Sequence, residues 1–347
     1  RQEDNGQAAG AARAERVPAA DDHAAARRRE QRNRQSHARA RQRAARWRHG
    51  SKDHCGAAGS LMKLLLHAGP MKTGSTAFQE LLGANHALLE QSGIRFRHLR
   101  RQELDDLEAV MEEEERTGWP RVLLLSHECL CRLDPQRLGG ALRLVPVSAE
   151  AVLVARPLRE VYPSLYLQNL KGHVMRTSSY EEFLQEQIER DRRPAHAERG
   201  QVFRYAFLDE QMQAAGCAVH WVSYRRSSLL VDLVAWLAHH ANATEALRGL
   251  KPLPTPTGVS PRRSLDGTVV EVARLLNDCC RAGTVSLEDR NNLLVALLDS
   301  SDRIRSQRHG LDSFRENHAD QLDALDHELN GDFWRQRAMH PTPWEPT

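Results

Sequence analysis

Short, uninterrupted apolar segments alternate with helical patterns along most of this chain, and that alternation limits the folds it can adopt. The apolar segments are LMKLLLHA (61–68), RVLLLSHE (121–128), EAVLVARP (150–157) and CAVHWVSY (217–224). Continuous runs of this length are typical of strands buried on both faces of a parallel sheet. Helical patterns lie at 158–170, 180–192, 205–215 and 227–241. The sequence therefore predicts an α/β fold, a parallel central sheet flanked by helices in three layers.

Charge and composition divide the chain into three parts. Residues 1–60 hold 13 Arg and one Lys against seven acidic residues, a balance of +7, whereas the whole chain carries +3. This segment has few branched aliphatic residues, so it cannot bury enough apolar surface to offset its ordering entropy. We predict an Arg/Ala-rich disordered tail over 1–60; nucleic-acid binding by it is the alternative to a solvated tail. A folded domain is expected over 61–335, mainly helical from about 260, followed by a tail over 336–347.

Several classes of protein are disfavoured by what the chain lacks. No run reaches the ~18–20 consecutive apolar residues that a membrane-spanning helix needs, and no signal-peptide pattern is present. The six cysteines are scattered without CxxC spacing, so free thiols in a reducing compartment are expected. The 17 histidines show no paired ligand spacing, and we expect no metal. A soluble cytoplasmic protein is the prediction.

A glycine-containing loop follows the first predicted strand. The stretch LLLHAGPMKTGSTAFQ (64–79) passes through a Gly-Pro turn into KTGST (72–76) and then a helical pattern. Such a loop turns backbone N–H groups toward one point, and the helix start adds its positive dipole end. Lys72 adds a charge, and Ser75 and Thr76 add hydroxyl donors. In the nucleotide-triphosphatase motif the lysine follows the last glycine. Here Lys72 precedes Gly74, and we predict a site for one phosphate- or sulfate-like group.

A second anion site is predicted at the end of the third strand. In ARPLREVYPSLYLQNLK, Arg156 ends the strand and Ser164 follows eight residues later on a predicted helix. Arginine offers a forked, charge-assisted contact and serine a hydroxyl. The alternative is that Arg156 pairs with a local acid such as Glu160 and that Ser164 only lies on a helix face. Two anion sites at neighbouring strand ends suggest a ligand with an anionic group at each end.

These two motifs resemble those of sulfotransferases that use 3′-phosphoadenosine 5′-phosphosulfate (PAPS), particularly the bacterial branch. HAGPMKTGST resembles the 5′-phosphosulfate loop, and ARPLREVYPSLY resembles the 3′-phosphate segment. The likeness runs from about Leu61 to about Gly331 and implies a P-loop-like three-layer fold. It departs from the family at 155–157 (Ala-Arg-Pro) and at 259–265 (VSPRRSL).

The resemblance implies sulfuryl transfer from PAPS to an acceptor hydroxyl or amine by in-line displacement, without a metal. Lys72 would lie at the bridging oxygen, and Thr73–Thr76 would hold the 5′-phosphate through backbone N–H groups and hydroxyls. Arg156 and Ser164 would bind the 3′-phosphate. Glu128 is the first candidate for the general base and His127 the second; since adjacent strand residues point to opposite faces, we expect at most one of them to face the acceptor.

Two other functions stay open. A P-loop-type small-molecule kinase would share the fold, with Glu128 recruited to bind magnesium. An inactive sulfotransferase-like binding module is the second alternative. The acceptor could be a small molecule, a carbohydrate or a lipid, because acceptor pockets come from variable loops. Segments 95–118 and 172–200 are candidates for those loops, although 103–116 is also predicted to be a solvated surface helix. Lys171 is a candidate for the acceptor side, although an exposed lysine at a helix end is the favoured alternative. The basic residues of the second segment are His173, Arg176, Arg190, Arg192 and Arg193.

Overall fold

The computed structural model describes residues 62–145, 147–172, 174–193, 203–251, 267–301 and 316–337. The chain divides into two units, Arg1–Ala58 and Gly59–Thr347, and the described residues all belong to the second. The predicted tails at 1–60 and beyond 337, the segment 259–265 and His173 lie outside the described residues.

Five parallel strands form one sheet, in the order β2-β3-β1-β4-β5. The strands are β1 (Lys63–His67), β2 (Ile94–His98), β3 (Val122–Ser126), β4 (Ala149–Ala155) and β5 (Cys217–Ser223). The four strands expected from continuous apolar runs are present, and the α/β prediction is confirmed. β2 was not predicted: it reads IRFRH, and its two arginines interrupt the apolar pattern.

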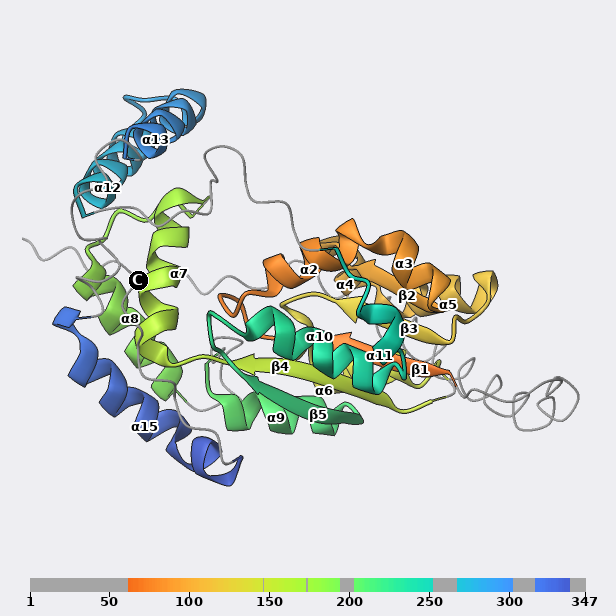
Figure 1. Ribbon diagram of the computed structural model, residues 1–347. Coiled ribbons are helices and arrows are strands. Elements are labelled where there is room, and N and C mark those ends of the chain that lie inside the picture. The colour runs from red at the N-terminus through yellow and green to blue at the C-terminus, as the bar shows by residue number, and fades with distance from the viewer. Residues whose placement is uncertain are drawn as a thin grey trace, which may run out of the picture. The chain divides into compact units, whose positions relative to one another are not determined.

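Helices cover both faces of the sheet (Figure 1). Those before β4 are α2 (Ser75–Ala84), α3 (His86–Gln91), α4 (Arg101–Asp105), α5 (Leu107–Thr117), the 3₁₀ turn η1 (Leu130–Arg132) and α6 (Pro135–Leu142). Those after β4 are α7 (Leu158–Lys171), α8 (Tyr180–Arg192), α9 (Tyr205–Ala214), α10 (Leu229–His240), α11 (Thr244–Leu247), α12 (Gly267–Arg281), α13 (Leu287–Ser301) and α15 (Ala319–Gln336).

Alternating strand residues divide the core between the two faces. On β1, Leu65 packs with α2, α3, α10 and α11, whereas Leu64 and Leu66 pack with α5, α6 and α9. This alternation with full burial on both sides is what a sandwiched parallel strand requires. The three-layer architecture follows from it.

A third core belongs to the helices alone and confirms the predicted helical C-terminal part. Residues of α7 and α8 pack there against α12, α13 and α15. Both ends of α7 are held by these later helices: the backbone N–H of Leu158 donates to Asp326 at 3.2 Å, and the carbonyl of Leu170 accepts from Arg290 at 2.6 Å and from Asn277 at 3.0 Å. The C-terminal helices thus fix the position of α7 relative to the sheet edge.

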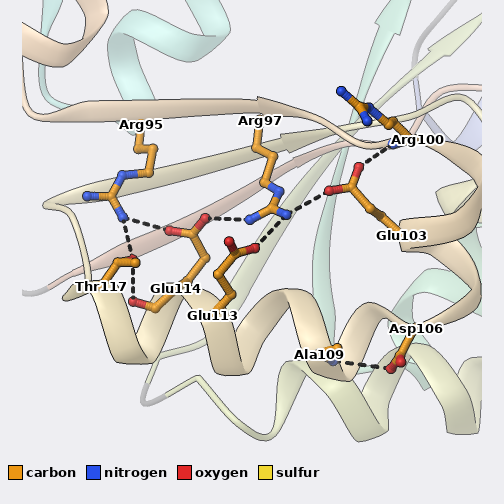
Figure 2. A network of polar contacts seen from close by, with 9 residues as sticks. All are labelled: Arg95, Arg97, Arg100, Glu103, Asp106, Ala109, Glu113, Glu114 and Thr117. Carbon is orange, nitrogen blue, oxygen red and sulfur yellow. Dashed lines mark hydrogen bonds and ion pairs between the residues drawn. The ribbon is translucent and has the colours of Figure 1, made fainter.

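The acidic segment predicted to be one solvated helix forms two helices, α4 and α5, that are partly buried. Glu114 is only 3% exposed and accepts from Arg95 at 2.7 Å and from Arg97 at 3.1 Å. Arg97 also pairs with Glu103 at 2.6 Å and with Glu113 at 2.8 Å (Figure 2). The prediction was wrong because the arginines of β2, the strand that the sequence did not reveal, neutralise these carboxylates.

None of the helices in the described part of the chain is long and apolar enough to cross a membrane.

Candidate functional site

The strand order of the sheet reverses direction next to β1. After β1 the chain builds β2 and β3 on one side, and then crosses to β4 and β5 on the other side. In parallel sheets, ligands bind at the carboxyl ends of the strands where the order reverses in this way. The loop at residues 68–74 and Arg156 both lie at this switch point, between β1 and β4.

The loop after β1 has a closely packed backbone. Lys72 and Gly74 both have positive φ angles, of 66° and 84°. The hydroxyl of Thr73 is buried and donates to the carbonyl of Pro70 at 2.6 Å, so it serves the loop itself. A Cβ on Gly69 would lie 3.4 Å from the Thr73 hydroxyl and 3.5 Å from the Val154 backbone nitrogen. The loop therefore passes within van der Waals distance of β4.

The loop ends on an uncapped helix start. Gly74 is the N-cap of α2 and has no side-chain capping hydrogen bond. The first N–H groups of a helix have no intrahelical partner and carry the positive end of its dipole. Ser75 is buried, with its hydroxyl 3.5 Å from that of Thr73, whereas Thr76 is exposed. The KTGST segment therefore lies at the switch point and leads directly into the start of α2.

Three charged groups surround Lys72. Burial lowers the pKa of its ammonium group, the charge of Glu128 opposes this shift, and the charge of Arg156 adds to it. At the last residue of α7, burial and the nearby charge of Lys72 lower the pKa of Lys171 to about 8. Residues from the ends of β3, β4 and α7 thus share one electrostatic environment with the loop, which suits an anionic ligand.

Arg156 is held by contacts within the protein. Its Nε donates to Glu160 at 3.1 Å, its Nη1 donates to the backbone carbonyl of Lys72, and its guanidinium lies over the Tyr224 ring at 4.1 Å from the centroid. The Tyr205 hydroxyl accepts from the Arg156 backbone nitrogen at 3.1 Å and donates to the Arg156 carbonyl. The pairing with Glu160 is the alternative that the sequence left open, so an anion at this position would compete with that carboxylate.

Ser164 lies half-buried on α7, two turns beyond the position of Arg156. At about 1.5 Å per residue, it is roughly 9 Å along the axis from Leu158, where α7 begins. Arg156 therefore lies just before α7 begins, whereas Ser164 lies near the middle of that helix.

His127 and Glu128 lie beyond the end of β3, which stops at Ser126. The expectation that strand alternation would separate them was wrong, because neither residue belongs to the strand. The Nδ1 atom of His127 accepts a hydrogen bond from the Cys129 backbone nitrogen at 2.9 Å. A neutral His127 therefore carries its proton on Nε2 and has no free basic nitrogen. Glu128, which interacts with Lys72, is the better placed of the two candidates for a general base.

Sequence reasoning missed a polar group at the ends of β1 and β3. The buried His67 lies 2.8 Å from the Ser126 hydroxyl through Nδ1, and Gln79 of α2 donates to the same hydroxyl at 3.0 Å. Burial, with a smaller contribution from His98, lowers the pKa of His67 to about 4. His98 ends β2, with its ring centroid 6.3 Å from that of His127. His67, His98 and Ser126 are each the last residue of a strand, and this shared position could have revealed the group from the sequence.

The basic residues proposed for an acidic acceptor are largely engaged by local groups. Arg176 pairs with Glu186 at 2.9 Å and lies over Phe183, and Arg192 pairs with Glu328 at 2.6 Å. Segment 95–118 likewise contains β2, α4 and α5 instead of a free loop. Within the described residues of 172–200, the arginines Arg176 and Arg192 are paired with acids, and 95–118 is built from a strand and helices.

Away from the carboxyl ends of the strands, folding brings together Glu150, His220 and His240. These residue types are metal ligands, and their spacing in the sequence did not reveal the group.

Comparisons of the chain with family models, with curated proteins and with solved structures return no match.

Proposed function

We propose that this chain is a sulfotransferase that uses PAPS as sulfuryl donor. One observation carries the proposal: at the switch point of the sheet, Lys72 lies in the turn of an uncapped loop-to-helix junction and interacts with Glu128 and Arg156. A lysine inside the turn, before Gly74, suits the bridge of a single phosphosulfate. The kinase-type loop instead places its lysine after the last glycine, for the terminal phosphates.

The residues present fit such a donor. Gly74 allows the left-handed turn that leads into α2, and the N-cap of α2 makes no side-chain capping hydrogen bond. The first amides of α2, with Ser75 and Thr76, would hold the 5′-phosphate. Arg156 would bind the 3′-phosphate once its contact with Glu160 is shared or exchanged, and Ser164 would add a hydroxyl.

When bound, PAPS supplies the sulfuryl group and the leaving phosphate. Glu128 would accept the proton of the acceptor hydroxyl as the new O–S bond forms. Lys72 would neutralise the charge that develops on the bridging oxygen as the S–O bond to the 5′-phosphate breaks. Loss of one preorganised donor of this kind costs about 3 kcal/mol of barrier. Lys171 would add a second positive charge beside Lys72.

The acceptor is a hydroxyl or amine of a small molecule, a carbohydrate or a lipid. Arg176 and Arg192 are already paired with acids. Their pairing gives no support to a strongly acidic acceptor on segment 172–200.

The first experiment measures nucleotide binding by thermal shift and by calorimetry. Adenosine 3′,5′-bisphosphate is expected to bind the wild type without magnesium, and binding should be at least roughly tenfold weaker in Lys72→Ala. Lys251→Ala is the matched control, because Lys251 is exposed and far along the chain from the loop. Preference for ATP with magnesium over the bisphosphate would replace this proposal with the kinase.

The second experiment tests catalysis with ³⁵S-labelled PAPS and a panel of hydroxyl and amine acceptors. Transfer by the wild type that is lost in Lys72→Ala supports the proposal. Tight bisphosphate binding without transfer to any acceptor class would identify a binding module instead.

A further inference from the structure

Three side chains with metal-binding atoms meet at the amino end of β4. Glu150 is the second residue of β4, His220 belongs to β5, and His240 is the last residue of α10. Their ligand atoms all lie within 4.8 Å of one another. Glu150 Oε2 is 3.4 Å from His220 Nε2 and forms a hydrogen bond with His240 Nδ1, and the two imidazole centroids are 4.3 Å apart.

The fold creates this group from distant parts of the sequence. The β4–β5 register pairs Glu150 with Ala218 and Val152 with His220. Residues two apart on a strand share a face, so Glu150 and His220 project from the same side of the sheet. Val152 on that side packs in one core with α10, and α10 ends at His240.

The end of α10 is also fixed to the sheet. Lys63, the first residue of β1, donates from Nζ to the carbonyl of His240 at 2.6 Å. The group therefore lies at the amino ends of the strands. The loop with Lys72 lies at the carboxyl ends, so the two sites are at opposite ends of the strands.

The environment of the His220 ring suits a metal. The Nε2 atom of His220 is shielded from solvent and makes no hydrogen bond within the described part of the chain. A buried polar atom without a hydrogen bond destabilises the fold, and a metal ion held together with Glu150 would satisfy it.

We propose that Glu150, His220 and His240 bind a Zn²⁺ ion. Two imidazole nitrogens and one carboxylate oxygen are a ligand set that zinc accepts, with water in the fourth position. Tetrahedral bonds of about 2.0–2.1 Å separate ligand atoms by roughly 3.3 Å, close to the 3.4 Å between Glu150 and His220. The hydrogen bond between Glu150 and His240 opens on binding, and the ring proton of the neutral His240 moves from Nδ1 to Nε2 by exchange with solvent, which leaves Nδ1 free to bind the metal.

Bound zinc would connect the edge strand β5 and the end of α10 to β4. Because the three ligands come together only in the folded chain, metal binding favours the folded state. A hundredfold excess of Zn²⁺ over its Kd is expected to raise Tm by roughly 5 °C. This role is independent of the proposed sulfuryl transfer.

The test uses the full chain, stripped with a chelator and then equilibrated with Zn²⁺ in the presence of a weak competing chelator. Metal content, Tm and the visible absorption of the Co²⁺-substituted protein are measured for the wild type, His220→Ala and Glu150→Gln. The matched control is His239→Ala, which removes an exposed histidine beside His240. Circular dichroism confirms that each variant is folded.

The wild type and the control are expected to retain one more zinc per chain than His220→Ala and Glu150→Gln. They alone should show the Tm increase and a Co²⁺ spectrum of tetrahedral type. Equal zinc content and equal Tm shifts in the wild type and in both site variants would overturn the proposal. The difference between variants also removes any contribution from histidines elsewhere in the chain.

Discussion

Arg156 donates a hydrogen bond from Nη1 to the backbone carbonyl of Lys72, joining the end of β4 to the turn of the loop after β1, 84 residues earlier. The same guanidinium pairs with Glu160 through Nε at 3.1 Å. Two of its three nitrogens are therefore occupied, Nη1 by the loop and Nε by a carboxylate of α7. Arg156 thus has a structural role in addition to the anion-binding role proposed for it.

The two roles of Arg156 can be separated by a pair of variants. Arg156→Ala leaves the largely buried Glu160 without its partner and is expected to cost about 3 kcal/mol of unfolding free energy. It should also weaken bisphosphate binding roughly tenfold or more. Arg156→Ala/Glu160→Gln removes the unpaired charge, so most of the stability should return while binding stays weak. Urea unfolding and calorimetry measure both quantities; recovery of binding in the double variant would show that Arg156 does not contact the nucleotide.

Glu128 is expected to be the general base. Glu128→Gln should lower kcat by roughly 10²- to 10⁴-fold and leave bisphosphate binding nearly unchanged, because the amide cannot accept a proton. His127→Gln should lower kcat less than about tenfold, since Nδ1 of His127 already accepts from a backbone N–H. Single-turnover transfer of labelled sulfate compares the two variants. Full activity of Glu128→Gln would reject the assignment.

Lys171 should produce a pH-dependent stability. Burial and the charge of Lys72 lower its pKa to about 8 from 10.5, so between these pH values the unfolded chain binds more protons than the folded chain. Stability therefore rises with pH in this window. Lys171→Met should raise the unfolding free energy at pH 7 by on the order of 1 kcal/mol and abolish that rise.

Ligand binding provides an independent test of Lys171. A bound anion favours the charged ammonium, so bisphosphate affinity of the wild type should fall as pH increases above about 8. Lys171→Met should bind more weakly at pH 7 and lose this dependence. Lys251→Met, which changes an exposed lysine, serves as the control in both experiments. A parallel pH profile for wild type and Lys171→Met would refute the interpretation.

The sequence predicted features that depend on neighbouring residues and missed features that depend on residues far apart in the chain. β1, β3 and β4 were predictable because strands buried on both faces are continuously apolar. β2 was missed because an edge strand carries polar residues, here Arg95 and Arg97, whose partners lie on a later helix. That omission also made α5 look solvated.

The candidate site shows the same division. The loop at 68–74 and Arg156 lie at the carboxyl ends of their strands, as the sequence predicted. This was predictable because the carboxyl ends of parallel strands lie on the same side of the sheet. The electrostatic interaction of Lys171 with Lys72 depends on the position of α7, which the C-terminal helices fix. No local sequence pattern encodes that position. The group of Glu150, His220 and His240 joins three elements and has no sequence spacing to reveal it.

The network on β2 gives a prediction about stability alone. Glu114 accepts from both Arg95 and Arg97 and is almost fully buried. Glu114→Ala leaves two arginines partly buried without this partner and is expected to cost about 3 kcal/mol. Arg116→Ala, at an exposed position of α5, should change stability by less than about 0.5 kcal/mol. Similar denaturation midpoints for the two variants would mean that the network contributes little.

Gly74 links the stability of the loop to its binding function. Its φ is 84°, and an added Cβ would lie 2.3 Å from Leu229 Cδ2. Gly74→Ala should therefore cost more than the ~1–2 kcal/mol of left-handed strain alone, because the loop or Leu229 must also move. Gly283→Ala is the matched control: its φ is 75°, but nothing lies within 4 Å of the added atom. Bisphosphate binding should weaken at least roughly tenfold in Gly74→Ala and remain unchanged in Gly283→Ala. Equal destabilisation with intact binding in both variants would show that the close packing of the loop against Leu229 is not needed to hold the anion.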